Sequence, residues 1–403
     1  MKKSMIVAAM LAMVATGANA KSATDSATIA KNKPVFTVVK QNPITSIKDQ
    51  NRSGTCWAYS TLSYFESEIL KHTGKTYDLS EMFLANKTYM DRATMAVRIH
   101  GDVSFSQGGS AYDVLYALQH YGIVPEGAMP APGTLTGDSL ANFGEFFDVM
   151  TPYVEAVAKS NAKKISSAWK SGLQGIIDSY IGKTPEKFTY QGKQYTPQSF
   201  CQSLGLNLDD YVTITSYTHH PMWSKFAVEV QDNWRWPLSY NVPMDDLCKI
   251  IDNAINNGYT IAWGGDVTED GFTRKGLGIA YDVKKVRSMA GTDADHWFKL
   301  SKDEKKEKFD SLGVNAPEVV PTQAMRQEAF DNWETTDDHG MHIYGIAKDQ
   351  NGKEYYMVKN SWGEYGDYKG TWYMTKAFVA YKTMDFMVNK NAIPKDIRKK
   401  LGI

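Results

Sequence analysis

The stretch Gln50-Asn51-Arg52-Ser53-Gly54-Thr55-Cys56-Trp57 places a cysteine directly after a loop of polar residues and turn formers. Behind the cysteine, apolar residues recur at helical spacing, which is typical of an amphipathic helix whose stripe faces a core. The stripe consists of Ala58, Leu62, Phe65 and Ile69. Gly74 then interrupts the pattern and is expected to end the helix. Cys56 therefore lies in the first turn of a predicted helix.

This position suits a nucleophilic sulfur. Unpaired backbone N–H groups and the helix dipole stabilise an anion there, which favours the thiolate over the thiol. Gly54 lets a substrate approach the backbone because no Cβ stands in the way. Gln50 can donate an amide hydrogen bond, and with the Cys56 backbone N–H it could hold the oxyanion that forms when sulfur attacks a carbonyl.

A nucleophile of this kind needs a base, and the C-terminal part of the sequence offers one. His339 precedes one apolar segment, Asn360 follows the next, and the turn signal Asn351-Gly352 between them predicts a β-hairpin. A hairpin brings the start of its first strand beside the end of its second. The Asn360 carbonyl can then accept a hydrogen bond from the imidazole and fix its tautomer, while Trp362 could keep water away. His342 is the competing base, but residues three apart on a strand face opposite sides.

These residues resemble the papain-like cysteine peptidases. The loop ending at Cys56 is similar to their active-site loop, and Asn360-Ser361-Trp362-Gly363 matches their Asn-Ser-Trp-Gly motif. Leu79-Ser80-Glu81 and Gly108-Gly109 also fall where the family carries similar residues. Cys56 and His339 are 339 − 56 = 283 residues apart, whereas the papain pattern places its histidine roughly 130–150 residues after the cysteine. The excess predicts an insertion.

The insertion resembles that of the bleomycin hydrolase/aminopeptidase C branch. The similar segments are Leu208-Asp209-Asp210-Tyr211-Val212, Asn241-Val242-Pro243, Trp263-Gly264-Gly265-Asp266-Val267 and His339-Gly340-Met341. The resemblance implies an α+β papain-like fold of two subdomains, a helical half with Cys56 and a β-rich half with His339 and Asn360. It places the peptidase domain at residues 41–403, with a large, mainly helical insertion at about residues 130–330.

The resemblance also implies an activity and a set of site residues. The chain would be a cysteine peptidase, acting as an aminopeptidase on peptides through an acyl-enzyme, without a cofactor and as a homo-oligomer, a hexamer. The implied catalytic residues are Cys56, His339, Asn360 and Gln50, and the implied cleft residues are Gly108, Gly109, Trp57, Trp362 and Ile403. Ile403 is included because in this branch the C-terminal carboxylate lies in the cleft and limits binding to the free amino end of a peptide.

The tail leaves two alternatives open. It ends Lys399-Lys400-Leu401-Gly402-Ile403 rather than in small residues as in better-known members. A papain-like endopeptidase with an open cleft is therefore one alternative, and a non-catalytic peptide-binding protein of the same fold is the other.

Composition excludes several other classes of protein. The chain has 403 residues, of which 42% are hydrophobic and 22% charged, as in an ordinary packed protein. Its formal charge of zero provides no basic surface for nucleic acid. We find no Walker-type Gly-x-x-x-x-Gly-Lys-Ser/Thr loop, His-Glu-x-x-His pair or Gly-x-Ser-x-Gly elbow, the motifs of kinases, metallopeptidases and serine hydrolases. His219-His220 lacks a third ligand nearby in the sequence, so no metal site is predicted.

The N-terminus predicts export. Lys2 and Lys3 precede the apolar residues 5–14, and Ala18-Asn19-Ala20 supplies the small residues that a signal peptidase reads. Residues 1–20 are thus a predicted signal peptide, residues 21–40 an N-terminal arm, and the mature protein is expected in the periplasm or outside the cell. A retained anchor is the alternative, although the apolar run is short for a stable membrane span.

Three cysteines cannot all pair within one chain. Cys201 and Cys248 are expected to be buried apolar residues or to form a disulfide with each other. Cys56 is then the cysteine whose free thiol calls for a chemical explanation.

Overall fold

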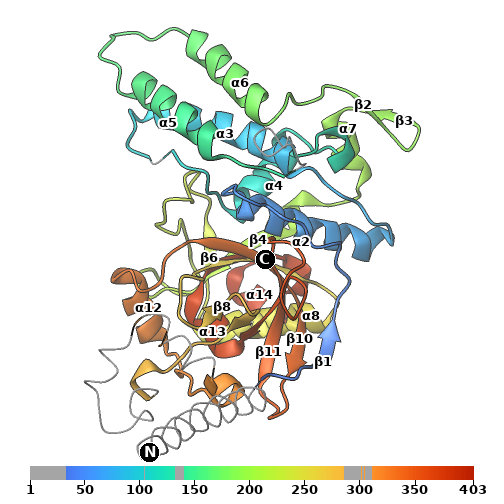
Figure 1. Cartoon of the computed structure of the whole chain (residues 1–403), viewed down its shortest axis with the longest axis vertical. Coiled ribbons are helices and arrows are strands. Elements are labelled where there is room, and N and C mark those ends of the chain that lie inside the picture. The colour runs from blue at the N-terminus through green and yellow to red at the C-terminus, as the bar shows by residue number, and fades with distance from the viewer. Residues whose placement is uncertain (1–32, 104, 132–139, 286–300, 302–303, 305–310) are drawn as a thin grey trace, which may run out of the picture.

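The computed structural model describes residues 33–103, 105–131, 140–285, 301, 304 and 311–403. The predicted signal peptide, residues 1–20, lies outside this range, as do residues 21–32 of the predicted arm. Figure 1 shows two halves along the long axis, one built mainly from helices and the other around a sheet. This is the two-part α+β arrangement that the sequence predicts.

The helical half contains α2 (Cys56–Thr73), α3 (Glu81–Arg98), α4 (Ala111–His120), α5 (Gly144–Ala158), α6 (Ala168–Tyr180), α7 (Pro197–Ser203) and the small hairpin β2 (Phe188–Tyr190) and β3 (Lys193–Tyr195). The helices of the sheet half are α8 (Met244–Asn256), α12 (Gln323–Asp331), α13 (Lys376–Lys382) and α14 (Lys395–Leu401). Among the described residues, no helix is long and apolar enough to cross a membrane.

The sheet half is organised around one large sheet of eleven described strands. Ten of them lie in the order β5-β6-β4-β13-β7-β10-β11-β12-β9-β8, and β1 pairs with β10. Its strands are β1 (Thr37–Gln41), β4 (Tyr211–Thr215), β5 (Lys225–Phe226), β6 (Ser239–Asn241), β7 (Ile261–Gly265), β8 (Phe272–Thr273), β9 (Leu277–Gly278), β10 (His339–Lys348), β11 (Glu354–Lys359), β12 (Thr371–Thr375) and β13 (Thr383–Asn389). Buried side chains from its strands and from α8, α13 and α14 form one hydrophobic core.

Helix α2 connects the two halves. It begins at Cys56 and ends at Gly74, whose left-handed φ of 69° closes the last turn, as the sequence predicts. From Trp57 to Ile69 every residue is buried, because α2 packs against α3 and α4 on the helical side and against β7 and β10 on the other. The start of α2 is thereby fixed at the boundary between the halves.

The predicted hairpin is confirmed. Strands β10 and β11 are antiparallel, with His342 opposite Lys359, and Gly352 in the connecting turn has a φ of 82°. On its other side β10 pairs with β7, where His339 lies opposite Gly265. His339 and Asn360 consequently lie at the same end of the ribbon.

The predicted insertion, about residues 130–330, contributes to both halves. Helices α5, α6 and α7 extend the helical half, whereas β4, β6 and β7 are paired inside the large sheet. Strand β5 is short, Lys225–Phe226, and the chain then continues as a loop. That loop reaches the boundary between the halves at Asp232.

A buried arginine holds the beginning of β13 in place. Arg326 on α12 is 1% exposed. Its guanidinium donates to the backbone oxygens of Ser216 at 2.8 Å and of Tyr381 at 3.1 Å, and also to those of Ala380 and Thr383. These bonds satisfy buried carbonyls at the junction of α13 and β13 and the carbonyl of Ser216, which follows β4.

We predict that Arg326→Leu destabilises the fold. The substitution leaves the four carbonyls without their donor, which costs about 3 kcal/mol or more at roughly 1 kcal/mol each. Thermal melting followed by circular dichroism should show a clear fall in Tm. Arg98→Leu, at an exposed position near the end of α3, is the matched control and should melt like the wild type; equal melting of both variants would contradict this role of Arg326.

Candidate active site

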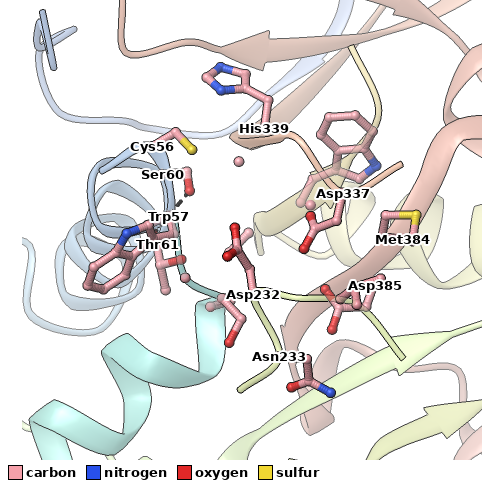
Figure 2. A pocket seen from close by; sticks show the side chains of 18 of the residues that line it. Cys56, Trp57, Ser60, Thr61, Asp232, Asn233, Asp337, His339, Met384 and Asp385 are labelled. Atoms are coloured by element: carbon pink, nitrogen blue, oxygen red, sulfur yellow. Dashed lines mark hydrogen bonds between the residues drawn. The ribbon is translucent and has the colours of Figure 1, made fainter. Parts of the chain in front are cut away.

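Cys56 and His339 line one pocket between the halves. The pocket has an empty volume of about 610 Å³, and its walls come from α2, the start of α4, β7, β10, β13 and the loop at Asp232. Figure 2 shows the Cys56 sulfur and the His339 ring at the same end of this pocket. The structure thus brings together two residues that are 283 positions apart in the sequence.

Strand β10 reaches α2 closely because residue 340 is a glycine. A Cβ at Gly340 would lie 2.7 Å from Ser60 Oγ and 3.3 Å from the Cys56 carbonyl oxygen. One turn further along α2, His342 Nδ1 is 2.8 Å from Ser63 Oγ. His342 is therefore engaged away from the pocket, and His339 is the histidine beside Cys56.

Asn360 holds the His339 ring. His339 Nε2 lies 2.8 Å from Asn360 Oδ1, and both side chains are buried. The Ser361 backbone N–H donates to the same oxygen at 2.8 Å, which fixes the amide so that its oxygen faces the ring. His339 therefore carries its proton on Nε2 and leaves Nδ1 unprotonated, the state required of a base. The Trp362 ring lies 4.9 Å from the His339 ring, centroid to centroid, and covers this contact.

Burial sets the charge state of the pair. It raises the pKa of Cys56 to about 12, against hydrogen bonding by the Gly340 backbone, and the negative charges of Asp232 and Asp337 add to the rise. Burial also lowers the pKa of His339 to about 4, partly offset by the bond to Asn360. Neither group ionises easily alone. Proton transfer from sulfur to imidazole creates two opposite charges side by side, so the two groups titrate as a pair.

Gln50 lies beside the pocket rather than in its wall. Its Nε2 donates to the Ser53 backbone oxygen at 2.8 Å, and its Oε1 accepts from Ser361 Oγ at 2.6 Å. The Gln50 backbone N–H also donates to the Ser361 oxygen at 2.8 Å. An amide nitrogen carries two hydrogens, so Gln50 Nε2 has a second hydrogen that the bond to Ser53 does not use. These bonds join the loop before Cys56 to the segment that carries Asn360.

Gln107 is a positioning residue that the sequence reasoning missed. The Gly54 backbone N–H donates to Gln107 Oε1 at 2.7 Å, and Trp57 Nε1 donates to the Gln107 backbone oxygen at 3.1 Å. Gln107 thus fastens the loop and the first turn of α2 to the segment before α4. Its position directly before Gly108-Gly109 was the available signal.

The two glycines have different neighbours. Gly109 lines the pocket together with Trp57, and a Cβ there would lie 2.9 Å from Trp57 Cδ2. Gly108 is not among the residues that line the pocket, but a Cβ there would lie 1.8 Å from Asp232 Oδ2. Gly109 therefore gives the Trp57 ring its space, and Gly108 gives space to a carboxylate of the pocket.

Ile403 does not line this pocket. Strand β13 begins at the pocket with Met384 and Asp385 and ends at Asn389, whose amide bonds Glu68 far along α2. Beyond this strand, Ile397 and Leu401 of helix α14 belong to the core of the sheet half, and Ile403 packs against that core. Neither Ile403 nor Trp362 belongs to the residues that line the pocket.

Four carboxylates that line the pocket were not anticipated from the sequence, those of Asp232, Asp337, Asp338 and Asp385. Figure 2 shows Asp232, Asp337 and Asp385 directed into it from three different segments. Only Asp337 and Asp338 had a sequence signal, their position directly before His339. The other two come from distant parts of the chain, and only the fold brings them to the site.

The remaining cysteines and histidines lie elsewhere. All three cysteines are free, so Cys201 and Cys248 do not pair. His219 and His220 do acquire a third partner, because their Nε2 atoms lie 3.0 and 3.1 Å from the two carboxylate oxygens of Glu229. These three exposed or half-buried side chains are close enough to hold a metal ion, outside the residues that line the Cys56 pocket.

Comparison with known proteins agrees with this geometry. A family model described as the peptidase C1-like family matches residues 2–313 and 310–402. Aminopeptidase G of Lactobacillus delbrueckii subsp. lactis is 23% identical over 89% of this chain and 84% of its own length. Aminopeptidase C of Lactobacillus helveticus is 23% identical, over 90% and 85%. The crystal structure of PepW from Lactobacillus rhamnosis HN001 shares the fold with a TM-score of 0.67 and 18% identity, over 99% of this chain and 95% of that one.

We predict that His339→Ala slows alkylation of Cys56 by iodoacetamide at neutral pH roughly a hundredfold, the scale of a lost proton acceptor. The reason is that the thiol, with a pKa of about 12, no longer has a base beside it. In the unsubstituted protein the rate should fall as the pH drops through about 4, where His339 becomes protonated and cannot accept a proton. Peptide mass spectrometry in a Cys201→Ser, Cys248→Ser background measures the rate at Cys56 alone.

His72→Ala, at an exposed position near the end of α2, is the control and should leave the rate unchanged. An equal alkylation rate with and without the His339 imidazole would show that the ring does not activate the sulfur.

Proposed function

Because the chain belongs to the peptidase C1-like family, we propose that it is a cysteine aminopeptidase in which Cys56 is the nucleophile and His339 the acid–base group. The observation that carries this proposal is the 2.8 Å bond between His339 Nε2 and Asn360 Oδ1, at the pocket that Cys56 lines. It leaves the other ring nitrogen free to take a proton. The relatives that match over most of the chain are named aminopeptidases.

In the first half of the reaction Cys56 becomes acylated. As the Cys56 sulfur attacks the peptide carbonyl carbon, its proton moves to His339 Nδ1, and the carbonyl oxygen becomes an oxyanion. The Cys56 backbone N–H at the start of α2 and the remaining Nε2 hydrogen of Gln50 are the donors that can hold this oxyanion. Collapse of the intermediate expels the peptide amine, which takes the proton from His339 and leaves a thioester on Cys56.

In the second half a water molecule resolves the thioester. His339, now neutral, accepts a proton from water as the oxygen attacks the acyl carbon. The same oxyanion donors act again, the carbon–sulfur bond breaks, and the proton returns to sulfur. Asn360 keeps the ring in one orientation through both halves, and Trp362 shields the hydrogen bond between them.

An aminopeptidase must recognise the free amino end of its substrate. The sequence assigned this role to the C-terminal carboxylate at Ile403, but that residue packs on the sheet core. Selection of the amino end therefore requires another group in this chain. An open-cleft endopeptidase is the alternative that the sequence left open, and the relatives, which are named aminopeptidases, do not favour it.

We also propose that the protein is exported and forms a homo-oligomer. The basic start, the apolar residues 5–14 and Ala18-Asn19-Ala20 support export. Val320 and Trp333, 80% and 85% exposed, are apolar side chains that a partner subunit would cover. Amino-terminal sequencing of the processed chain and its mass in solution test these two proposals; an intact N-terminus or a monomeric mass would refute the corresponding one.

We predict that the mature protein hydrolyses phenylalanine 7-amido-4-methylcoumarin and leaves the N-acetylated form of this substrate intact. Cys56→Ser should abolish turnover, because the hydroxyl is a far weaker nucleophile than the thiolate. Cys201→Ser is the matched control, since Cys201 is buried outside the pocket, and it should retain full activity. Fluorescence release under reducing conditions measures each rate.

Two outcomes would contradict the proposal in different ways. Cleavage of the acetylated substrate at a similar rate would favour the endopeptidase. Retained cleavage of either substrate by Cys56→Ser would refute the nucleophile.

A further inference from the structure

The pocket beside Cys56 contains more acidic charge than the reaction needs. Asp232, Asp337, Asp338 and Asp385 line it, whereas no lysine or arginine does. His339, its one basic side chain, is neutral at ordinary pH because burial lowers its pKa to about 4. The described wall of the pocket is therefore suited to a cation and unsuited to an anion.

The carboxylates differ in how far the protein already compensates them. Arg92 contacts Asp232 at 3.2 Å, and Ser106 Oγ lies 3.4 Å from the same oxygen. Asp338 accepts from the Val267 backbone N–H at 2.9 Å. From the described residues, Asp385 receives only a 3.4 Å contact, from Ser239 Oγ. The negative charge of Asp232 is thus paired with Arg92, whereas the negative charge of Asp385 has almost no compensation.

Asp337 has no such partner. Within the ranges that the structure describes, its carboxylate makes no hydrogen bond and no ion pair, although the residue is half-buried in the wall of the pocket. Burial, with repulsion from Asp232 and Asp385, raises its pKa well above the ordinary value. Figure 2 shows it directed into the pocket, facing Asp232. A carboxylate that is removed from water is costly unless a positive charge pairs with it. The described residues supply no such charge to Asp337.

We propose that Asp337, with Asp385 and Asp232, forms the site that binds a positively charged nitrogen of the peptide substrate. Two sources share this chemistry, the free α-amino group of the substrate and the side chain of a lysine or arginine beside the bond to be cleaved. This inference rests on the proposed peptidase activity and names the group that selects its substrates.

The position of Asp337 matches this role. It precedes His339 by two residues, and its charge acts on the Cys56 sulfur, so a cation bound there lies next to the reacting bond. An ammonium group would form charge-assisted hydrogen bonds with these carboxylates. It would also offset the negative charge that, after burial, adds to the rise in the Cys56 pKa. Substrate binding would thereby favour the thiolate form of Cys56 at the step in which its sulfur attacks the peptide carbonyl.

The test measures binding without turnover. In the Cys56→Ser background, isothermal titration calorimetry compares three probes: phenylalaninamide, which carries an α-ammonium group; N-acetyl-phenylalaninamide, which carries no charge; and Nα-acetyl-lysinamide, which carries its charge on the side chain. Asp337→Asn keeps the shape of the side chain and removes its charge. Asp245→Asn, at an exposed position on α8, is the matched control, and thermal melting checks that each variant is folded.

We expect Asp337→Asn to raise the Kd of one charged probe about tenfold or more, the range of a lost charge-assisted hydrogen bond. The Kd of the uncharged probe and all values for Asp245→Asn should stay unchanged. An effect on phenylalaninamide identifies the α-amino group, and an effect on Nα-acetyl-lysinamide identifies the side chain. Unchanged or equally changed Kd values for all three probes in folded Asp337→Asn would overturn the inference.

Because Cys56→Ser is inactive by design, this result is independent of turnover. Absence of hydrolysis by the wild type would contradict the proposed function, while the binding data would still decide whether Asp337 recognises a cation.

Discussion

The site depends on the close packing of strand β10 against the first turns of helix α2. Gly340 allows this approach, because a Cβ there would lie 2.7 Å from Ser60 Oγ. His342 bonds Ser63 one turn further on, which fixes the strand along the helix. His339 directly precedes Gly340, so the packing that joins the two halves also places the imidazole beside the sulfur. A larger residue at 340 would crowd Ser60 Oγ and the Cys56 carbonyl oxygen, directly beside the reacting sulfur.

Around this contact, hydrogen bonds within and between the halves hold the functional side chains in place. The loop that presents Cys56 is bonded to Ser361 through Gln50 and to Gln107 through Gly54. The histidine is oriented by Asn360. Burial then makes separate charges on Cys56 and His339 costly, so the proton moves between them as part of the reaction. The rigid frame is what makes this exchange possible, since neither group has to search for the other.

Much of this arrangement was predictable from local sequence. The start of α2 at Cys56, its end at Gly74 and the hairpin that joins His339 to Asn360 all follow from periodicity and turn chemistry. The resemblance to the papain-like cysteine peptidases is confirmed by the family model, which matches residues 2–313 and 310–402. Local patterns succeed here because each of these features is decided by residues that are neighbours in the chain.

The rest was not predictable because it depends on tertiary contacts. Asp232 and Asp385 come from a loop and a strand that are far apart in sequence, and no spacing rule relates them to Cys56. The packing of Ile403 against the core of the sheet half is likewise a tertiary contact that no local pattern predicts. The expectation of a stabilised thiolate considered the start of the helix alone, whereas burial inside the folded protein acts in the opposite direction and raises the pKa of Cys56.

The central claim is that Cys56, activated by His339, forms an acyl-enzyme with a peptide substrate. Rapid acid quenching of the protein during hydrolysis of phenylalanine p-nitrophenyl ester, followed by peptide mass spectrometry, tests it most directly. The account predicts one phenylalanyl group, carried as a thioester on Cys56 and absent when His339 is replaced by alanine. Turnover without an acyl group on Cys56, or with the acyl group on another residue, would contradict it.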